Sequence, residues 1–163
     1  MGKAIDLEDF KAAMGSFAAG VTLVTTLDAE GKPYGLTATA FSSVDPTPPT
    51  CLVCVAHDAE ACPVIASTAR FAVNVLGAEQ EALSNRFATK GADKFAHGLA
   101  WQQAPETGAP FVQGAIAQIE CSLLASHTQG GHEIFIGRVL GARVSEGAPL
   151  LHWRGRYGRL MEG

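Results

Sequence analysis

The sequence has no run of apolar residues that approaches the ~20 a membrane-spanning helix requires, so no membrane span is expected. Its first ten residues, MGKAIDLEDF, contain no apolar signal region, so no secretory leader is expected. Positive charge is not in excess, because 16 acidic residues outnumber 12 basic ones and the net charge is −4. Nucleic-acid binding needs a clustered basic face, and this composition excludes that class.

Cysteine is scarce: the chain has four, at positions 51, 54, 62 and 121. Cys51 and Cys54 have the C-x-x-C spacing of metal and redox sites, but they lie within TCLVCV, an apolar run typical of a strand. Residues three apart on a strand point to opposite faces, and no second pair accompanies them. We therefore expect reduced thiols and no metal site, which suits a cytoplasmic location.

The chain also lacks G-x-G-x-x-G after a strand, so a Rossmann dinucleotide domain is not expected. What it does have is 163 residues, 47% of them hydrophobic, enough for one domain over residues 1–163 with a sizeable core. No repeat, linker or low-complexity segment divides it.

Hydrophobic and β-branched patterns predict several strands joined by short turns, with few helices. Asp6 is expected to cap a first helix that ends at Gly20, and two further helices are expected over residues 59–69 and 79–88. Segments 45–49, with three prolines, and 89–110 are expected to be irregular. The expected strands cover residues 21–27, 34–41, 51–56, 71–76, 116–126 and 134–144, with turns at 28–33 and 129–131 and a closing segment at 149–160. This order predicts a β-barrel with helical additions.

One stretch of mostly small residues, GLTATAFSSV at 35–44, indicates a ligand surface. On a strand, Thr37, Thr39 and Phe41 would share one side and Leu36, Ala38 and Ala40 the other. A small-residue surface lets a flat ligand approach the backbone, and nearby hydroxyls can bind it. The alternative is an ordinary barrel strand with a Ser-Ser turn. The hydroxyls concerned belong to Thr37, Thr39, Ser42 and Ser43.

Five segments occur in an order that resembles the short-chain flavin reductases, the small components of two-component flavin monooxygenases. They are FAAGVTLVTTLDAEGKPYGLTATAFSSV, RFAVNVL, LSNRFA, HEIFIGRV and PLLHWRGRYGRL. The resemblance implies a mainly β, FMN-binding split β-barrel of Greek-key type with short flanking α-helices. It also implies a homodimer that reduces FMN or FAD with NADH or NADPH and a separate monooxygenase as partner. A non-catalytic flavin- or haem-binding carrier is the alternative; a pyridoxamine-phosphate-oxidase-like enzyme is a third, but the matched motifs are not that family's.

The resemblance assigns roles to residues of this chain. The flavin bed would be formed by Thr37, Ala38, Thr39 and Ala40, with Ser42 and Ser43 bonding the ribityl chain or phosphate. The segment Ser84, Asn85, Arg86 and Phe87 would lie close to the cofactor, with the Arg86 fork on the phosphate. Without the family, this segment would be the end of an amphipathic helix with a solvated arginine.

The chain departs from the family pattern after the third strand. An Asn-x-Ser-type run with a following Thr is replaced here by Ala56, His57, Asp58, Ala59, Glu60, Ala61 and Cys62. Ala56 and His57 are candidate cofactor contacts in this segment, but its two acids, Asp58 and Glu60, would repel a phosphate. We therefore expect weaker flavin binding, or binding through backbone N–H groups, with the choice between FMN and FAD open.

Histidine and the C-terminal cluster supply the remaining candidates. His132, after Gly130-Gly131, is the catalytic candidate, because the matching family residue borders the nicotinamide; the alternative is an exposed turn histidine. His127 is expected to face it across the turn, and His97 and His152 to be structural or surface residues. Trp153, Arg154, Arg156 and Tyr157 would either close the barrel by cation–π packing or grip nicotinamide phosphates, which makes Arg154 and Tyr157 candidate cofactor contacts.

Overall fold

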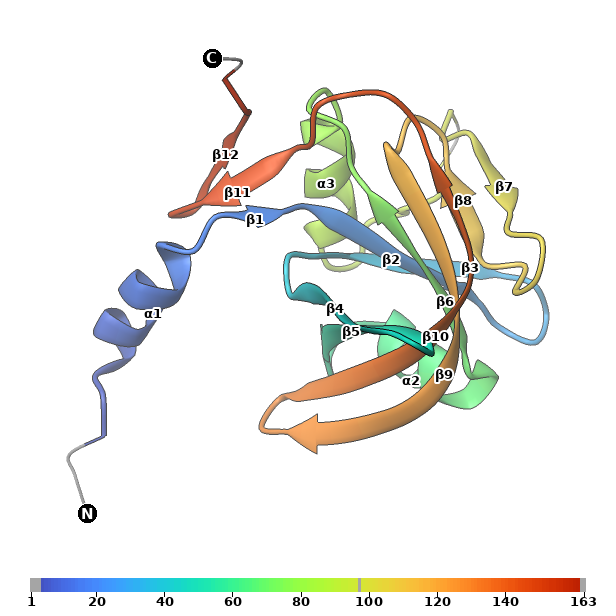
Figure 1. Ribbon diagram of the computed structural model, residues 1–163, viewed down its shortest axis with the longest axis horizontal. Coiled ribbons are helices and arrows are strands. Elements are labelled where there is room, and N and C mark those ends of the chain that lie inside the picture. The colour runs from blue at the N-terminus through green and yellow to red at the C-terminus, as the bar shows by residue number, and fades with distance from the viewer. Residues whose placement is uncertain (1–3, 97, 162–163) are drawn as a thin grey trace.

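The structure is a computed structural model that describes residues 4–96 and 98–161. Figure 1 shows a curled β-sheet with short helices at its margins and one helix standing away from it. The helices are α1 (Leu7–Gly15), α2 (Ala61–Thr68) and α3 (Glu81–Ala88). The strands are β1 (Ala19–Gly20), β2 (Thr22–Leu27), β3 (Pro33–Ala38), β4 (Phe41–Pro46), β5 (Pro49–Ala56), β6 (Arg70–Val75), β7 (Trp101–Gln103), β8 (Pro110–Val112), β9 (Ala117–Gln129), β10 (His132–Val144), β11 (Leu151–Trp153) and β12 (Arg156–Gly158).

Seven antiparallel strands form the main sheet, in the order β3-β2-β6-β9-β10-β5-β4. The first and last strands of this order are consecutive in the chain, so the sheet curls until they meet (Figure 1). The Cys54 amide donates to the Ala40 carbonyl over 3.0 Å and ties the connection between them to β5. The predicted mainly β split barrel with short helices is confirmed.

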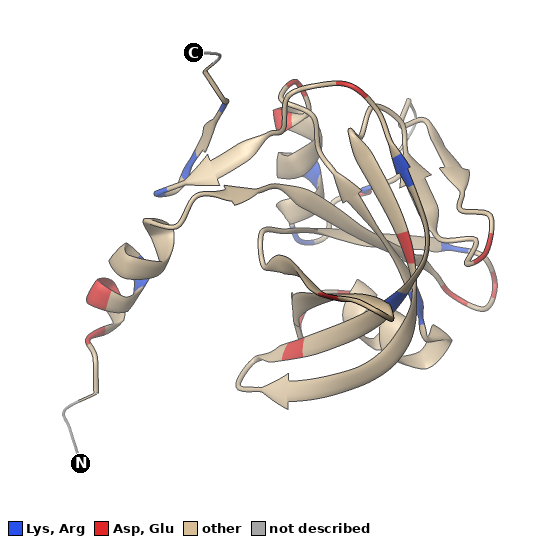
Figure 2. Cartoon of the chain, in the orientation of Figure 1, with Lys and Arg blue, Asp and Glu red and all other residues tan. Residues whose placement is uncertain are grey.

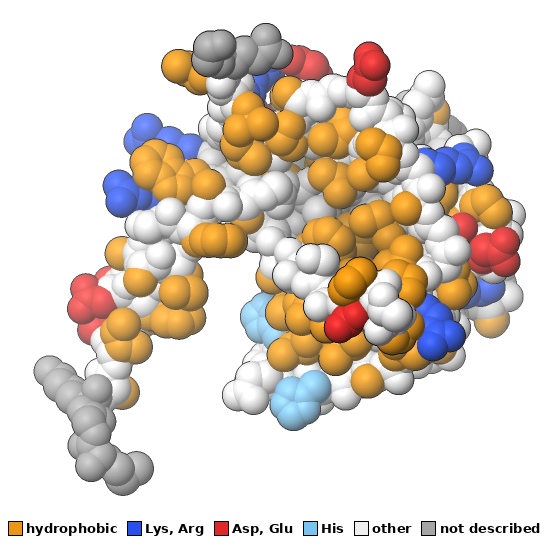
Figure 3. All heavy atoms as spheres, in the orientation of Figure 1, with side chains coloured by type: hydrophobic (Ala, Val, Ile, Leu, Met, Phe, Trp, Pro, Cys, Tyr) orange, Lys and Arg blue, Asp and Glu red, His pale blue; other side chains and the backbone are white. Residues whose placement is uncertain are grey.

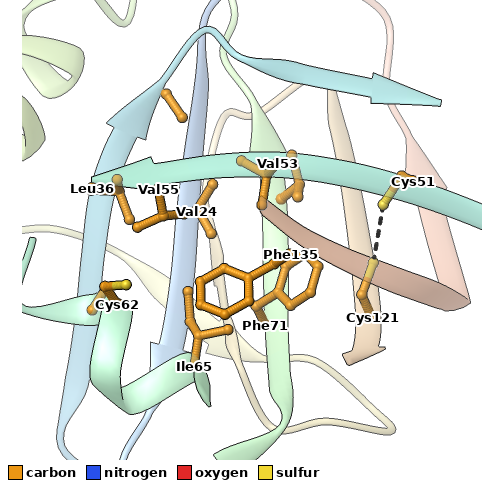
Figure 4. Close-up of a cluster of buried hydrophobic side chains, with 13 residues drawn as sticks. Val24, Leu36, Cys51, Val53, Val55, Cys62, Ile65, Phe71, Cys121 and Phe135 are labelled. Carbon is orange, nitrogen blue, oxygen red and sulfur yellow. Dashed lines mark hydrogen bonds between the residues drawn. The ribbon is translucent and has the colours of Figure 1, made fainter. Parts of the chain in front are cut away.

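A buried apolar cluster fills the barrel, and alternate residues of β5 build one wall of it. Val53 and Val55 point inward toward Phe71 and Phe135 (Figure 4). The thiols of Cys51 and Cys121 meet there, with 3.6 Å between the sulfur atoms. Cys54 is half-buried on the other face of β5, as the strand spacing predicted for the C-x-x-C pair.

The longest hairpin, β9–β10, carries its strands further than predicted. Each has 13 residues, and the two-residue turn Gly130-Gly131 joins them. Gly130 has φ of 56°, a conformation that glycine adopts without a Cβ clash. Further along, Gly137 leaves room for a core ring, since a Cβ there would lie 2.6 Å from Phe71 Cζ.

The predicted strand over residues 34–41 is wrong in one respect: the chain bends at Thr39-Ala40 and begins β4 at Phe41. The alternation expected across residues 36–41 is therefore broken. The predicted loop 45–49 is also shorter, because only residues 47–48 lie between β4 and β5. Prolines at these strand ends are tolerated because β4 is an edge strand.

The first helix ends at Gly15 and not at Gly20 as predicted. Residues 19–20 instead pair with β11, and this β1–β11–β12 ribbon uses the closing segment of the chain. The segment expected to be irregular, residues 89–110, contains β7. Among the described residues, no helix has both the length and the apolar character needed to cross a membrane.

Candidate functional site

A hollow of about 280 Å³, here called the first hollow, opens beside the bend between β3 and β4. Its walls come from the end of β3, the β5–α2 connection, the end of α3 and the segment that follows α3. Thr37, Ala56 and Phe87, all predicted site residues, lie in these walls. Thr39 and Ala40 are exposed at the adjoining bend. The barrel closure thus places small residues and backbone at the rim of a concave site.

A hydrogen-bond network joins four of the predicted residues. The Thr37 hydroxyl donates to the Ser84 carbonyl over 2.6 Å, and the Ser84 hydroxyl lies 2.8 Å from the Tyr157 hydroxyl. The Tyr157 hydroxyl in turn donates to Asn85 Oδ1 over 2.9 Å. Because Ser84 is fully buried, this network fixes α3 and the C-terminal hairpin against β3.

Close packing holds the floor of the first hollow. Gly35 on β3 is buried against Phe87, and a Cβ at position 35 would lie 2.6 Å from Phe87 Cε1. Only glycine therefore lets α3 approach β3 this closely.

Charged side chains lie around the mouth. Lys90 hydrogen-bonds Asp58, and this contact holds the pKa of the Asp58 carboxyl below its usual value, with a smaller contribution from His132. The Lys94 ammonium donates to the Gly35 carbonyl over 2.9 Å. Burial lowers the Lys94 pKa, and the charge of Glu60 opposes that shift. Figure 2 shows acidic and basic residues interspersed in the described part of the chain, so these lysines act as individual partners and not as part of a broad basic face.

His132 begins β10 and pairs with Ala56 at the end of β5, which places it at the same rim. It is exposed. The neighbouring His57 holds the β5–α2 connection to the hairpin: its amide donates to the Gly131 carbonyl over 2.9 Å, and its Nε2 lies 3.2 Å from Glu133 Oε2. The Thr128 hydroxyl also donates to Glu133 Oε2, and its hydrogen bond is the largest cause of a lowered Glu133 pKa.

The expected pairing of His127 with His132 is wrong, because His127 lies opposite Ile134 in the hairpin register. His152 packs edge-on against Tyr157, with 5.7 Å between ring centroids, which fits a structural role. The prediction for His97 falls outside the described residues.

Several predicted cofactor residues do not reach the first hollow in this chain. Arg86 faces another hollow beside Leu83 and Leu99 on the far side of α3. Arg154 stacks on Trp153, with 4.7 Å from its guanidinium carbon to the ring centroid, and its guanidinium donates to the Ser16 hydroxyl. This contact corresponds to the predicted cation–π packing, at the junction with α1.

Three more predicted residues, Ala38, Ser42 and Ser43, also lie outside the walls of the first hollow, for different reasons. Ala38 belongs to the buried core, and its carbonyl accepts a hydrogen bond from the Thr22 hydroxyl over 2.8 Å. Ser42 and Ser43 are exposed on β4, and the Ser42 hydroxyl donates to the Ser43 carbonyl over 2.9 Å.

Sequence reasoning missed Lys90 and Lys94, which lie in the segment that was expected to be irregular. Both lysines line the first hollow, and Arg86 does not. The available signal was the spacing of two lysines four residues apart directly after α3.

Residues 14–161 match the model of the flavin reductase like domain. The chain belongs to this family. It is 38% identical over 158 residues to the flavin reductase (NADH) of Kitasatospora aureofaciens, covering 95% of this chain and 82% of that protein. It is 37% identical over 156 residues to the flavin-dependent monooxygenase reductase subunit HsaB of Rhodococcus jostii, covering 95% and 78%. The NADH:FAD oxidoreductase SgcE6 of Streptomyces globisporus, solved with NAD and FAD fragments, superposes with a TM-score of 0.89 at 34% identity, covering 98% of both chains.

The first hollow fits the flavin that this flavin reductase family implies. Thr39 and Ala40, which follow the wall residue Thr37 along the chain, are small and exposed, so a flat ring would meet no bulky side chain at this bend. Lys90 and Lys94 offer cations to a phosphate, while Asp58 and Glu60 oppose them. The donor set therefore fits the group, and the two acids would weaken the binding of its phosphate.

Proposed function

We propose that this chain is an NAD(P)H-dependent flavin reductase that reduces FMN or FAD and supplies reduced flavin to a separate monooxygenase. The observation that carries this proposal is the open hollow at the β3–β4 bend, in a chain of the flavin reductase-like family. Relatives named as an NADH flavin reductase and as a monooxygenase reductase subunit support the reaction and the partner. All four cysteines are free thiols, which supports a cytoplasmic location.

The chain's own residues would hold the flavin by shape and by backbone contact. The ring would lie on the exposed bend at Thr39-Ala40, and the phosphate end would lie toward Lys90 and Lys94. Bound flavin supplies a hydride acceptor, which is the chemistry that the protein itself lacks. The Thr37–Ser84–Tyr157 network keeps the supporting wall in place.

His132 would position the nicotinamide. It is exposed at the rim beside Ala56 and lies within the electrostatic influence of Asp58. Hydride transfer requires no proton relay at the moment of transfer, so the imidazole contributes by orienting the donor ring. Orientation of this kind lowers a barrier without changing the chemistry.

A homodimer completes the proposal. Helix α1 buries none of its residues, and its apolar side chains Leu7, Phe10 and Met14 are exposed, with Phe17 just beyond it 79% exposed. Figure 3 shows this apolar surface on an arm that stands apart from the barrel. Exposed apolar side chains also lie on the barrel strands, at Val44, Leu124 and Leu140. A second copy would cover both surfaces, as contiguous apolar patches generally require.

The test is oxidation of NADH or NADPH by pure protein with excess FMN, FAD or riboflavin. We expect loss of the nicotinamide absorbance with at least one flavin and none without protein. If no flavin supports turnover with either nucleotide, the carrier alternative holds instead.

A further inference from the structure

A second hollow, of about 460 Å³, lies beside β7 and β8, on the opposite side of the barrel from α1 (Figure 1). Its walls come from β7, from the connection between β8 and β9, and from the segment that follows β10. The described residues that line it are all different from those that line the first hollow. Its volume lies within the roughly 300–1,000 Å³ that small-molecule sites occupy, and the flavin site makes no use of it.

The walls of the second hollow combine aromatic side chains with hydrogen-bond acceptors. Trp101 is half-buried and Phe111 is buried in these walls. Gln118 Nε2 donates to the Val112 carbonyl over 2.8 Å. Because a carbonyl can only accept, this bond fixes the orientation of the amide and leaves Gln118 Oε1 as an acceptor. The exposed carboxylate of Glu146 is another acceptor at the same hollow, so the walls suit a flat ring that carries a hydroxyl donor.

The charges around the second hollow favour an uncharged ligand. Within the described part of the chain, its walls contain Glu146 and no basic side chain. Arg143 pairs with Gln118 in the β9–β10 register and packs over the Phe111 ring, just outside these walls. The two opposite charges oppose each other's field, so neither an acid nor an amine is attracted strongly. A phenolic hydroxyl, with a pKa of about 10, is an uncharged donor at neutral pH.

Three aromatic rings in contact connect the second hollow to the first. Trp101 packs edge-on against Phe95, with 5.9 Å between ring centroids. Phe95 packs edge-on against Phe87, with 5.1 Å between centroids. Phe87 lines the first hollow and Trp101 lines the second. A ligand that contacts Trp101 therefore acts on side chains that support the wall of the flavin site.

We propose that the second hollow is an effector site for an uncharged aromatic alcohol, and that its occupation strengthens flavin binding in the first hollow. A ring held against Trp101 would restrict Phe95 and, through it, Phe87. Flavin would then meet a wall that is already ordered, so the ordering cost is not paid a second time. The coupling rests on the proposed function, because it requires flavin in the first hollow, whereas the binding of the alcohol does not.

The first test is isothermal titration of flavin-free protein with phenol, benzoate and toluene. We expect phenol to bind with a Kd on the order of 1 mM or tighter, as a ligand of its size allows. Benzoate is charged and has no hydroxyl hydrogen, and toluene lacks the hydroxyl, so each should bind at least about tenfold more weakly. Trp153→Phe leaves Trp101 as the sole tryptophan, and phenol should then change the tryptophan fluorescence of this variant.

Two variants locate the phenol. Ala100→Trp, at an exposed wall position, should fold and fill the second hollow, and it should weaken phenol binding more than about tenfold. Gln118→Leu removes the acceptor and should weaken phenol binding about tenfold. Gln103→Leu is the matched control, because Gln103 is exposed on β7 outside the walls, and it should bind phenol like the parent.

The second test measures the coupling between the two hollows. Saturating phenol should tighten FMN binding about fivefold, and FMN should tighten phenol binding by the same factor, because coupling of binding is reciprocal. Phe95→Leu interrupts the contact between Trp101 and Phe87. This variant should bind both ligands and lose the coupling between them.

Equal binding of phenol, benzoate and toluene would overturn the effector site, as would phenol binding that Ala100→Trp leaves unchanged. Phenol that competes with FMN would also overturn it, by placing phenol in the first hollow. An unchanged FMN affinity at saturating phenol would overturn the coupling. These outcomes are separable from the proposed function: a protein with the coupling that oxidises no NADH keeps the effector site and loses the reductase, and a reductase that does not bind phenol does the reverse.

Discussion

Ala38 and Thr39 are neighbours in the chain but belong to two different regions. Ala38 is 8% exposed and is part of the barrel core with Val53 and Phe135. Thr39 is exposed at the bend where β3 passes toward β4. The core needs no other molecule, because its apolar side chains are buried against one another within one chain. The rim of the first hollow differs, because it exposes backbone, hydroxyls and charges that a ligand could bind.

The two regions also differ in how their contacts contribute to stability. Burial of Phe71 and Phe135 removes large apolar surfaces from water, which is the main source of folding free energy. The Asp58–Lys90 pair at the rim is largely exposed, and pairs of that kind add little to stability. Substitutions in the core should therefore change folding, and substitutions at the rim should change binding.

Tryptophan at these two adjacent positions gives the largest contrast. Ala38→Trp should destabilise the fold by more than about 3 kcal/mol or prevent folding, because it overpacks the core. Thr39→Trp should change the free energy of unfolding by less than about 0.5 kcal/mol, since its side chain enters solvent. It should nevertheless weaken flavin binding more than about tenfold, because the indole would occupy the ring position.

Chemical denaturation and flavin titration of both variants measure these effects. A stable Ala38→Trp protein that has lost flavin would place the Ala38 side chain in the site and not in the core. A Thr39→Trp protein that binds flavin like the parent would remove the bend from the site.

The next prediction concerns α1, the helix that stands outside the core. Phe10→Asp combined with Met14→Asp should give a monomer of about 17.0 kDa, where the parent should have about twice that mass. Light scattering on the two proteins measures this. Lys11→Gln, on the same helix, should remain a dimer. A parent that is monomeric at working concentration would contradict the proposed homodimer.

A smaller effect is expected at His132. His132→Ala should slow reduction of bound flavin about tenfold, a barrier change of about 1.4 kcal/mol, through poorer orientation of the nicotinamide. Flavin affinity should change little. Anaerobic stopped-flow with a separate flavin titration distinguishes the two quantities. A normal reduction rate would make His132 a simple turn residue, and a lost flavin affinity would move its role to flavin binding.

The smallest effect is expected at Asp58. Asp58→Asn should raise FMN affinity about threefold, because it removes a negative charge near the phosphate and frees Lys90. Riboflavin, which has no phosphate, is the control ligand and should bind as before. An equal gain for both ligands would mean that Asp58 acts on the shape of the first hollow and not on its charge.

Much of the barrel could be predicted because β-branched and apolar periodicity is a local property of the sequence. The strand at residues 22–27 and the long β9–β10 hairpin follow from it. The bend at Thr39-Ala40 could not, because TATA continues the alternation of a strand. At the bend, the Ala40 carbonyl accepts a hydrogen bond from the Cys54 amide on β5, a contact between strands that no local pattern predicts.

The candidate site was predicted in part, through family motifs and not through spacing. Thr37, Ser84, Asn85 and Tyr157 do form one network, although up to 120 residues separate them. Arg86 lies outside the walls of the first hollow because Ser84 and Phe87 set the buried side of α3, and Arg86 lines a different hollow. Lys90 and Lys94, which do line the first hollow, lie in a loop. A loop has no regular repeat from which the sequence could predict where a side chain points.

The most direct test of the account is anaerobic reduction of flavin by NADH, with the parent protein and Thr39→Trp compared at matched concentrations. The account predicts that the parent bleaches the visible absorbance of FAD or FMN in proportion to the NADH consumed. It predicts that Thr39→Trp, although folded, does so more than about tenfold more slowly at subsaturating flavin, because binding is lost. Equal bleaching by the two proteins would contradict a flavin site at the β3–β4 bend, and no bleaching by either would contradict the reductase itself.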